Sequence, residues 1–163
     1  MRMTTICRLL LVGIFMTVMA LTVSAQNLPG VKTKAELEQL AKGLRSGEIT
    51  KSQILFNGGD HYVVDTSYFH AKHKAEAQAH AETDEILLVL AGEAQLTLGG
   101  KIIDEHLKDG SKVEFRGTGI KGGKVFKVKP GDVVSVPRGT PHHVEPGEGY
   151  IVYMVIKIPG LHA

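Results

Sequence analysis

Two segments of this chain carry side chains that can bind a transition metal. In the first segment Gln78 and His80 are separated by one residue, and Glu85 follows them. In the second, His142 follows the sequence 137–141, PRGTP. Alternate residues of a strand point to the same face, so Gln78 and His80 are expected to share a face. Two imidazoles, a carboxylate and an amide oxygen form a ligand set for one divalent transition metal.

Turns are predicted to bring these donors together. Thr83-Asp84 precedes Glu85, and residues 137–140 form a tight turn before His142. Two histidines and one carboxylate are the ligands of facial-triad Fe(II) sites, but Fe, Mn, Zn, Ni and Cu all use such donors. The sequence therefore leaves the metal undetermined. It also assigns Glu85 a second role as a catalytic proton acceptor.

The remaining histidines give weaker signals. His143 is adjacent to His142 on the expected strand, so we predict that it points outward, away from the site. His70 and His73 lie in the polar stretch HAKHKAEAQ and are predicted to be surface residues. No role is assigned to the others.

An amphipathic helix is predicted over residues 34–45. Thr33 and Glu36 have the spacing of a capping box, and Gly47 is placed to end the helix. The apolar residues at helical spacing are Ala35, Leu37, Leu40, Ala41 and Leu44. We expect this helix to pack on the outside of the rest of the domain.

From residue 49 onward the pattern is that of short strands. Apolar runs alternate with Gly, Asp and Pro clusters, which is typical of an all-β sandwich or barrel. The runs are 62–69, 85–90, 94–98, 124–129, 132–136 and 150–157. The segment 121–129, which carries four lysines, is predicted to be a half-buried strand with one solvent-exposed face, and the glycine-rich segment 117–123 to be a loop.

The N-terminal residues 1–25 have the pattern of a secretory signal. Arg2 and Arg8 precede the apolar stretch 9–21, and small residues lead up to a cleavage position after Ala25. The stretch is short for a membrane span of ~20 residues, although an uncleaved anchor is the alternative interpretation. We therefore predict a periplasmic or secreted bacterial protein, with no stable membrane insertion after cleavage.

Charge and cysteine content exclude several classes of protein. The chain has 163 residues with 19 Lys+Arg and 17 Asp+Glu, and its only cysteine is Cys7. A mature chain starting at residue 26 has no cysteine and equal numbers of basic and acidic residues, because the two arginines of the signal are lost. Disulfides and thiolate-based metal sites are excluded, and nothing indicates a nucleic-acid partner.

The two metal-ligand segments resemble the two cupin motifs. His80, Glu85 and Gly92 are at the motif spacing in the first segment, and Gly131-…-Pro137-x-Gly139-x2-His142 matches the second. The resemblance extends over residues 55–157 and is close to a group of small secreted bacterial cupins. It implies a jelly-roll β-barrel as residues 49–163, after a signal (1–25) and a helix segment (26–48).

This chain departs from the cupin pattern at three positions. Lys72 replaces the opening glycine, Pro146 the final asparagine, and Gln78 the first metal histidine. An amide oxygen is a weak neutral ligand, so the Gln78 position is either a weak ligand or lies beside a bound water.

Three functional hypotheses stay open. The first is a metal-dependent oxidoreductase resembling a dioxygenase and acting on a small organic substrate. The second is a lyase, isomerase or hydrolase that uses the metal as a Lewis acid. The third is a module that binds a metal or small ligand without turnover.

An isologous homodimer is expected, because the run 85–90 is apolar on both faces. Cupins also commonly pair through their sheets. The helix at 34–45 or a second sheet are the alternative covers for this strand.

Overall fold

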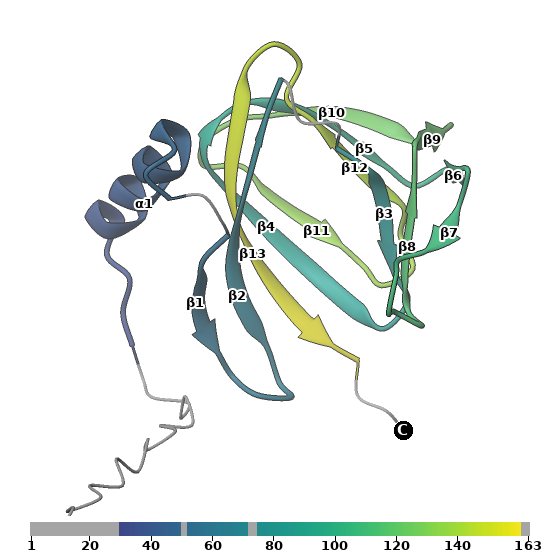
Figure 1. The fold of residues 1–163 in the computed structure, drawn as a ribbon, viewed down its shortest axis with the longest axis horizontal. Coiled ribbons are helices and arrows are strands. Elements are labelled where there is room, and N and C mark those ends of the chain that lie inside the picture. Colours follow the sequence, from purple (N-terminus) through teal and green to yellow (C-terminus); the bar gives the residue numbers. More distant parts are fainter. Residues whose placement is uncertain (1–29, 50–51, 72–74, 161–163) are drawn as a thin grey trace, which may run out of the picture.

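The protein is described by a computed structural model over residues 30–49, 52–71 and 75–160. Two antiparallel sheets face each other, and one helix lies outside them (Figure 1). The first sheet has the strand order β1 (Ile54–Asn57), β2 (Val63–His70), β13 (Tyr150–Pro159), β4 (Thr83–Gly92) and β11 (Val133–Val136). The predicted signal, residues 1–25, lies outside the described residues.

The second sheet is built from the middle of the chain. Its strand order is β10 (Lys124–Val128), β5 (Ala94–Leu98), β12 (His142–Glu145), β3 (Ala77–His80), β8 (Glu114–Gly117) and β7 (His106–Leu107). A small two-stranded sheet pairs β6 (Lys101–Ile103) with β9 (Gly119–Lys121). The chain crosses repeatedly between the two large sheets, which confirms the predicted all-β jelly-roll barrel.

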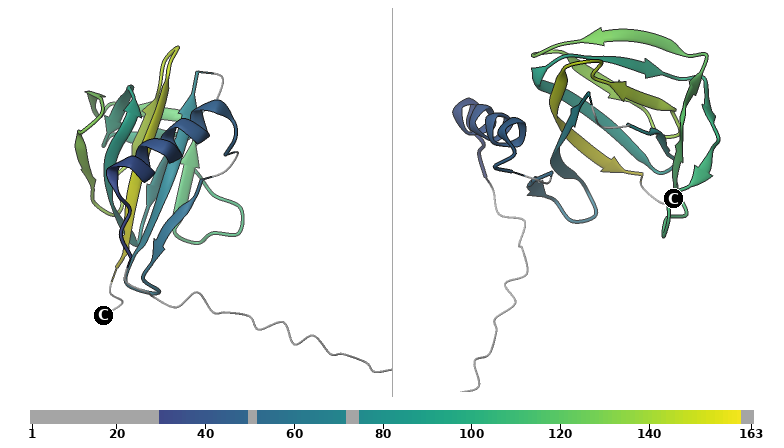
Figure 2. Two further views of the ribbon diagram at one scale, coloured as in Figure 1. Left: turned by 90° about the vertical axis from the view of Figure 1, so that its left-hand side faces the viewer. Right: turned by 45° about the horizontal axis from the view of Figure 1, so that its top comes forward.

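The helix α1 (Lys34–Ser46) runs across the outside of the first sheet (Figure 2). Its capping box between Thr33 and Glu36 is present, and Gly47 ends it with φ of 82°. Buried Ala41 and Leu44 pack on Val152, so the predicted amphipathic helix is confirmed. No helix in the described residues has both the length and the apolar character that a membrane span requires.

All six predicted strand runs are strands, with ends within two residues of the prediction. Two finer predictions were wrong. Residues 119–121 are not loop but form β9, because they pair with β6. Lys124–Lys127 are exposed rather than half-buried, because β10 is an edge strand of its sheet.

One end of the barrel interior is filled by a compact apolar core. Leu96 and Ile151 are each only 1% exposed. The cluster around them comprises Leu87, Val89, Ala94, Val128, Val136, Val144, Tyr153 and Val155. Its residues come from both large sheets, so the core holds the sheets together.

Gly92 allows the chain to pass from β4 toward β5 and the second sheet. Its φ is 74°, and a Cβ at this position would collide with the carbonyl oxygen of Tyr150. The same carbonyl accepts a hydrogen bond from the Glu93 amide at 2.9 Å. Only glycine satisfies both requirements here.

The strand β4 is covered differently on its two faces. Leu87 and Val89 point into the barrel, toward the second sheet. On the outer face α1 covers Leu90, whereas Leu88 is half-buried and the neighbouring Val133 is 66% exposed. Two of the expected covers, the helix and the second sheet, are therefore both present, and part of the outer face is left without a cover by the described residues.

Candidate metal centre

Three of the predicted ligands meet at the open end of the barrel. His80 is the last residue of β3, Glu85 lies on β4 and His142 is the first residue of β12. The His80 Nε2 atom is 3.5 Å from Glu85 Oε1, and the His142 Nε2 atom is 3.3 Å from Glu85 Oε2. One ligand atom of each residue lies within 4.8 Å of the others. This cluster has the composition and size to hold a metal ion.

Hydrogen bonds between the two motif segments position these side chains. The turn at residues 137–140 closes with a bond from the Thr140 amide to the Pro137 carbonyl at 3.0 Å. The Gly139 amide, at φ of 73°, donates to the His80 carbonyl at 2.7 Å. The turn that precedes His142 is therefore fastened directly to the strand that carries His80.

Asp84 makes a second connection between the segments. Its carboxylate accepts hydrogen bonds from the Arg138 amide at 2.7 Å and from Arg138 Nη2 at 2.6 Å. The side-chain and backbone bonds from Arg138 lower the pKa of Asp84. Because Asp84 precedes Glu85, this ion pair fixes the start of β4 against the turn that precedes His142.

Burial keeps both histidines neutral. Desolvation is the largest cause that lowers the pKa of His80 and of His142 to about 4, and it raises the pKa of Glu85. The imidazoles at pH 7 are therefore in the uncharged form that binds metal ions. No histidinium is available to balance the Glu85 carboxylate.

The orientation of His142 fits a metal ligand. Its Nδ1 is 3.1 Å from the carbonyl oxygen of Thr140, which can only accept, so Nδ1 carries the proton. The Nε2 lone pair then faces a carboxylate oxygen of Glu85, and two acceptors oppose each other across 3.3 Å. Metal–ligand bonds of about 2.1 Å place neighbouring donor atoms about 3.0–3.4 Å apart. The residues present therefore fit a divalent transition metal.

Gln78 shares the cavity wall with the three ligands, but its amide oxygen has another partner. Arg116 Nη1 donates a hydrogen bond to Gln78 Oε1, and the two residues are register partners between β3 and β8. Because a guanidinium only donates, this contact fixes the direction of the amide. Coordination of a metal by Gln78 stays a prediction.

The centre opens into a cavity of about 560 Å³. Besides the predicted ligands, its lining includes the polar residues Lys108, Glu114, Arg116, Tyr153 and Lys157. The sequence reasoning did not identify these residues as part of the site. The alternation of polar Glu114 and Arg116 with Phe115 was the available signal for a strand with one polar face.

Among the described residues, the other histidines are not part of this cavity lining. His143 points away from the cavity as predicted, yet it is only 8% exposed and its Nε2 lies 3.0 Å from the Ala75 carbonyl. His70 was expected at the surface but is half-buried, with its ring 5.6 Å from that of Tyr68. His73 lies outside the described residues.

No known protein-family profile and no curated protein matches the sequence. Among solved structures, BH2720 from Bacillus halodurans is similar at 18% identity and a TM-score of 0.55, over 85% of this chain and 87% of that chain. DMSP lyase DddQ from Ruegeria pomeroyi DSS-3 is similar at 17% identity and a TM-score of 0.51, over 86% and 70%. A cupin superfamily protein from Desulfitobacterium hafniense DCB-2 matches at 18% identity and a TM-score of 0.45, over 67% and 76%.

The chain has a cupin-type jelly-roll fold. At these levels of identity the similarity establishes the fold alone. Within the cupin fold of this chain, the first motif lies on β3 and β4 and the second spans β11 and β12. Each motif thus contributes one strand to each large sheet, and the two motifs pair within both sheets, β4 with β11 and β3 with β12. This pairing is why residues far apart in sequence meet at one centre.

Proposed function

We propose that this protein is an exported metal-dependent enzyme that acts on a small organic molecule. One divalent transition metal is held by His80, Glu85 and His142, and the reaction is an oxidation resembling that of a dioxygenase. The observation that supports this most directly is the pair of opposed acceptors, His142 Nε2 and Glu85 Oε2, 3.3 Å apart. A bound cation removes that repulsion.

The ligand set favours oxidative chemistry. Two histidines and one carboxylate form the facial triad of non-haem Fe(II) oxygenases, which leaves coordination positions open. A bound metal would supply Lewis acidity and, in the case of iron, a redox centre. The chain itself orients the imidazoles through Thr140 and excludes water from Glu85, which is 5% exposed.

A second candidate is a non-oxidative lyase, isomerase or hydrolase. The observation that favours it is a row of proton-carrying groups on the inner face of β13. Lys157 is the register partner of Glu85, and Tyr153 lies further along the same cavity wall. Such groups can hold or move protons during a reaction in which the metal acts only as a Lewis acid. Binding of a metal or small ligand without turnover is the third possibility.

Metal content and oxygen consumption test the proposal together. The purified exported protein is expected to contain close to one divalent transition metal per chain by elemental analysis. With Fe(II) bound, oxygen uptake in the presence of phenolic or enolic compounds supports the oxidative reaction. Turnover that proceeds without oxygen supports the second candidate. A protein that takes up no metal from Fe, Mn, Zn, Ni or Cu contradicts both enzyme proposals.

Export is proposed on the pattern of residues 1–25 and is tested separately. Expression of the full chain in a bacterial host is expected to give a periplasmic or secreted product that begins at Gln26. N-terminal sequencing after fractionation measures this. An uncleaved product in the membrane fraction contradicts the proposal.

Homodimer formation is proposed from the outer face of the first sheet. Next to α1, the exposed Val133 and Ile158 adjoin the half-buried Leu88, Met154 and Ile156. An apolar patch of this kind is typical of an interface between subunits. Light scattering at micromolar concentration is expected to return twice the monomer mass. The Val133→Glu variant is expected to return a lower average mass, because a charge in the interface weakens the dimer. A monomer mass for the wild type contradicts the proposal.

A further inference from the structure

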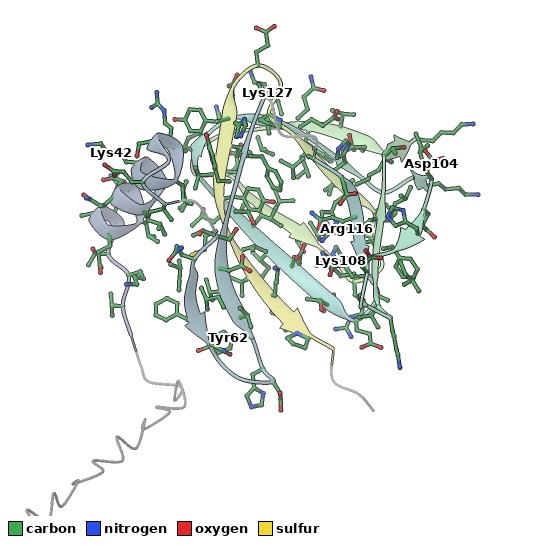
Figure 3. The ribbon with its side chains drawn as sticks, viewed as in Figure 1. Lys42, Tyr62, Asp104, Lys108, Arg116 and Lys127 are labelled. Carbon is green, nitrogen blue, oxygen red and sulfur yellow. The ribbon has the colours of Figure 1, made fainter. Side chains whose placement is uncertain are left out.

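One wall of the cavity carries two positive side chains for each negative one. Lys108 Nζ donates to Glu114 Oε2 at 2.8 Å, and Arg116 Nη2 donates to Glu114 Oε1. Glu114 thus pairs with both cations, and these three side chains together carry a net charge of +1. In Figure 3 Arg116 and Lys108 lie side by side where β8 approaches β3.

The other charges around the cavity balance more closely. Lys157 Nζ pairs with Asp65 Oδ2 at 2.9 Å, and imidazoles that bind a metal carry no charge. A divalent metal on the single carboxylate of Glu85 adds a second unbalanced positive charge. The metal-loaded cavity then remains positive overall even when the exposed Glu76 at its rim is counted.

We infer that the cavity binds a small organic anion whose carboxylate lies against Lys108 and Arg116. This deepens the proposed function by assigning its substrate class, and it rests on that function only for the contribution of the metal. A guanidinium has five N–H donors in a planar fork that matches a carboxylate, and Gln78 and Glu114 occupy two of them. The ammonium of Lys108 has three donors and gives one to Glu114.

Lys108 lies nearer the cavity mouth than Arg116, and this arrangement allows both to bind a ligand that enters from solvent. The side chain of Lys108 is 49% exposed and that of Arg116 is 17% exposed, so positive charge continues from the mouth inward. Such a gradient attracts anions and orients them. Phe69, Leu87 and Val155 on the cavity lining provide apolar contacts for the hydrocarbon part of the ligand.

A matched pair of ligands tests the need for negative charge. Salicylate and salicylamide have nearly the same shape, but only salicylate carries a carboxylate. We expect the zinc-loaded protein to bind salicylate about tenfold more tightly than salicylamide, because the carboxylate forms charge-assisted bonds. Titration followed by ligand fluorescence measures both constants. Equal affinity for the two ligands, or no binding of either, overturns the inference.

A matched pair of variants tests the place of binding. Lys108→Gln removes one charge at the cavity mouth, and Lys127→Gln removes one from β10, where the side chain is 70% exposed and pairs with Glu93 at 3.0 Å. Figure 3 shows Lys127 well away from Lys108. Lys108→Gln is expected to weaken salicylate binding about fivefold and to leave salicylamide binding unchanged. Lys127→Gln is expected to change neither by more than about twofold. Equal effects of the two variants overturn the inference.

The same measurements separate this inference from the proposed metal centre. If zinc does not bind, the proposed function fails, and the titrations are repeated on the metal-free protein. Lys108 and Arg116 do not depend on the metal, so weaker salicylate binding that still requires Lys108 supports the anion site. Salicylate binding that is insensitive to Lys108→Gln overturns the anion site in either form of the protein.

Discussion

The two ends of the barrel interior are built by the same strands and serve opposite purposes. Strand β4 contributes Glu85 to the open end and Val89 to the closed end, and β12 contributes His142 and Val144 in the same way. Along each strand the residues that point inward change from ionisable to apolar. The position along the strand therefore decides between site and core, while the alternation of faces decides only between inside and outside.

The energetics of the two ends also differ. Burial of apolar surface at the closed end stabilises the fold by roughly 25 cal/mol per Å². The open end buries Glu85 and two histidines, whose charged forms are disfavoured there. The stable end therefore maintains the arrangement of a site that, without a metal, is unfavourable.

The largest expected effect comes from removing a ligand at the open end. His142→Ala is expected to lower zinc affinity by at least about 100-fold, because too few strong donors remain. Competition with a chromophoric chelator measures the constant. The matched control is His143→Ala, which removes a buried imidazole that points away from the cavity and leaves zinc affinity unchanged. Loss of zinc affinity in both variants would show that folding rather than ligation is affected.

The closed end is tested by truncation of its most buried leucine. Leu96→Ala is expected to reduce the free energy of unfolding by about 3 kcal/mol through lost contacts and a cavity. Zinc affinity of the folded variant is expected to be unchanged, because Leu96 belongs to the other end. Val125→Ala, at a 57% exposed position on the neighbouring strand, should cost less than about 1 kcal/mol. Urea denaturation provides both values, and equal losses would contradict the assignment of the core.

Low pH is expected to reduce the folding stability of the metal-free protein, because the histidines at the open end take up protons. The folded pKa values of His80 and His142 are about 4, below the 6.5 of a free histidine, so the unfolded chain takes up protons first as pH falls. Histidine-linked stability is thus intact above about pH 6.5 and is lost progressively toward pH 4. Glu85, with its raised pKa, acts in the opposite direction over part of this window.

Two histidines act against a single carboxyl, so the net expectation is a lower free energy of unfolding at pH 5 than at pH 7. Denaturation of the chelator-treated protein at both pH values measures it. His142→Leu should show a smaller loss than wild type. A metal-free wild type that is equally stable at both pH values would contradict the neutral state of the buried histidines.

The smallest expected effect is at Gln78. Gln78→His offers an imidazole in place of an amide oxygen and is expected to tighten zinc binding about tenfold. Gln78→Ala is the control and should change affinity less than about threefold, because the amide oxygen is bound by Arg116. Chelator competition measures both. Weaker binding by Gln78→His would show that residue 78 does not face the metal.

Local patterns in the sequence were sufficient for the elements of the fold. The predicted helix begins after the capping box at Thr33 and ends at Gly47. Strand runs were found because apolar residues and turn residues alternate over a few positions. The failure at β10 has a different origin, since the exposure of its residues depends on its place at a sheet edge. Neighbouring residues in sequence carry no information on that place.

In the candidate site too, local sequence predicted some features, whereas others depend on the tertiary structure. Spacing within each motif was enough to single out His80, Glu85 and His142, which the structure brings together. The contact between Arg116 and Gln78 joins residues 38 positions apart, and that between Arg138 and Asp84 spans 54. Neither contact was predicted, because each depends on which strands become neighbours.

The sequence by itself determined which side chains share a strand face and where turns interrupt the strands. Both properties follow from the two-residue period of a strand and from residues such as Gly139 that permit a turn. Only the tertiary structure decided that Lys108, Glu114 and Arg116 line the wall beside the metal ligands. The physical reason is that the pairing of β3 with β8 is set by the closure of the whole barrel, and no local segment encodes it.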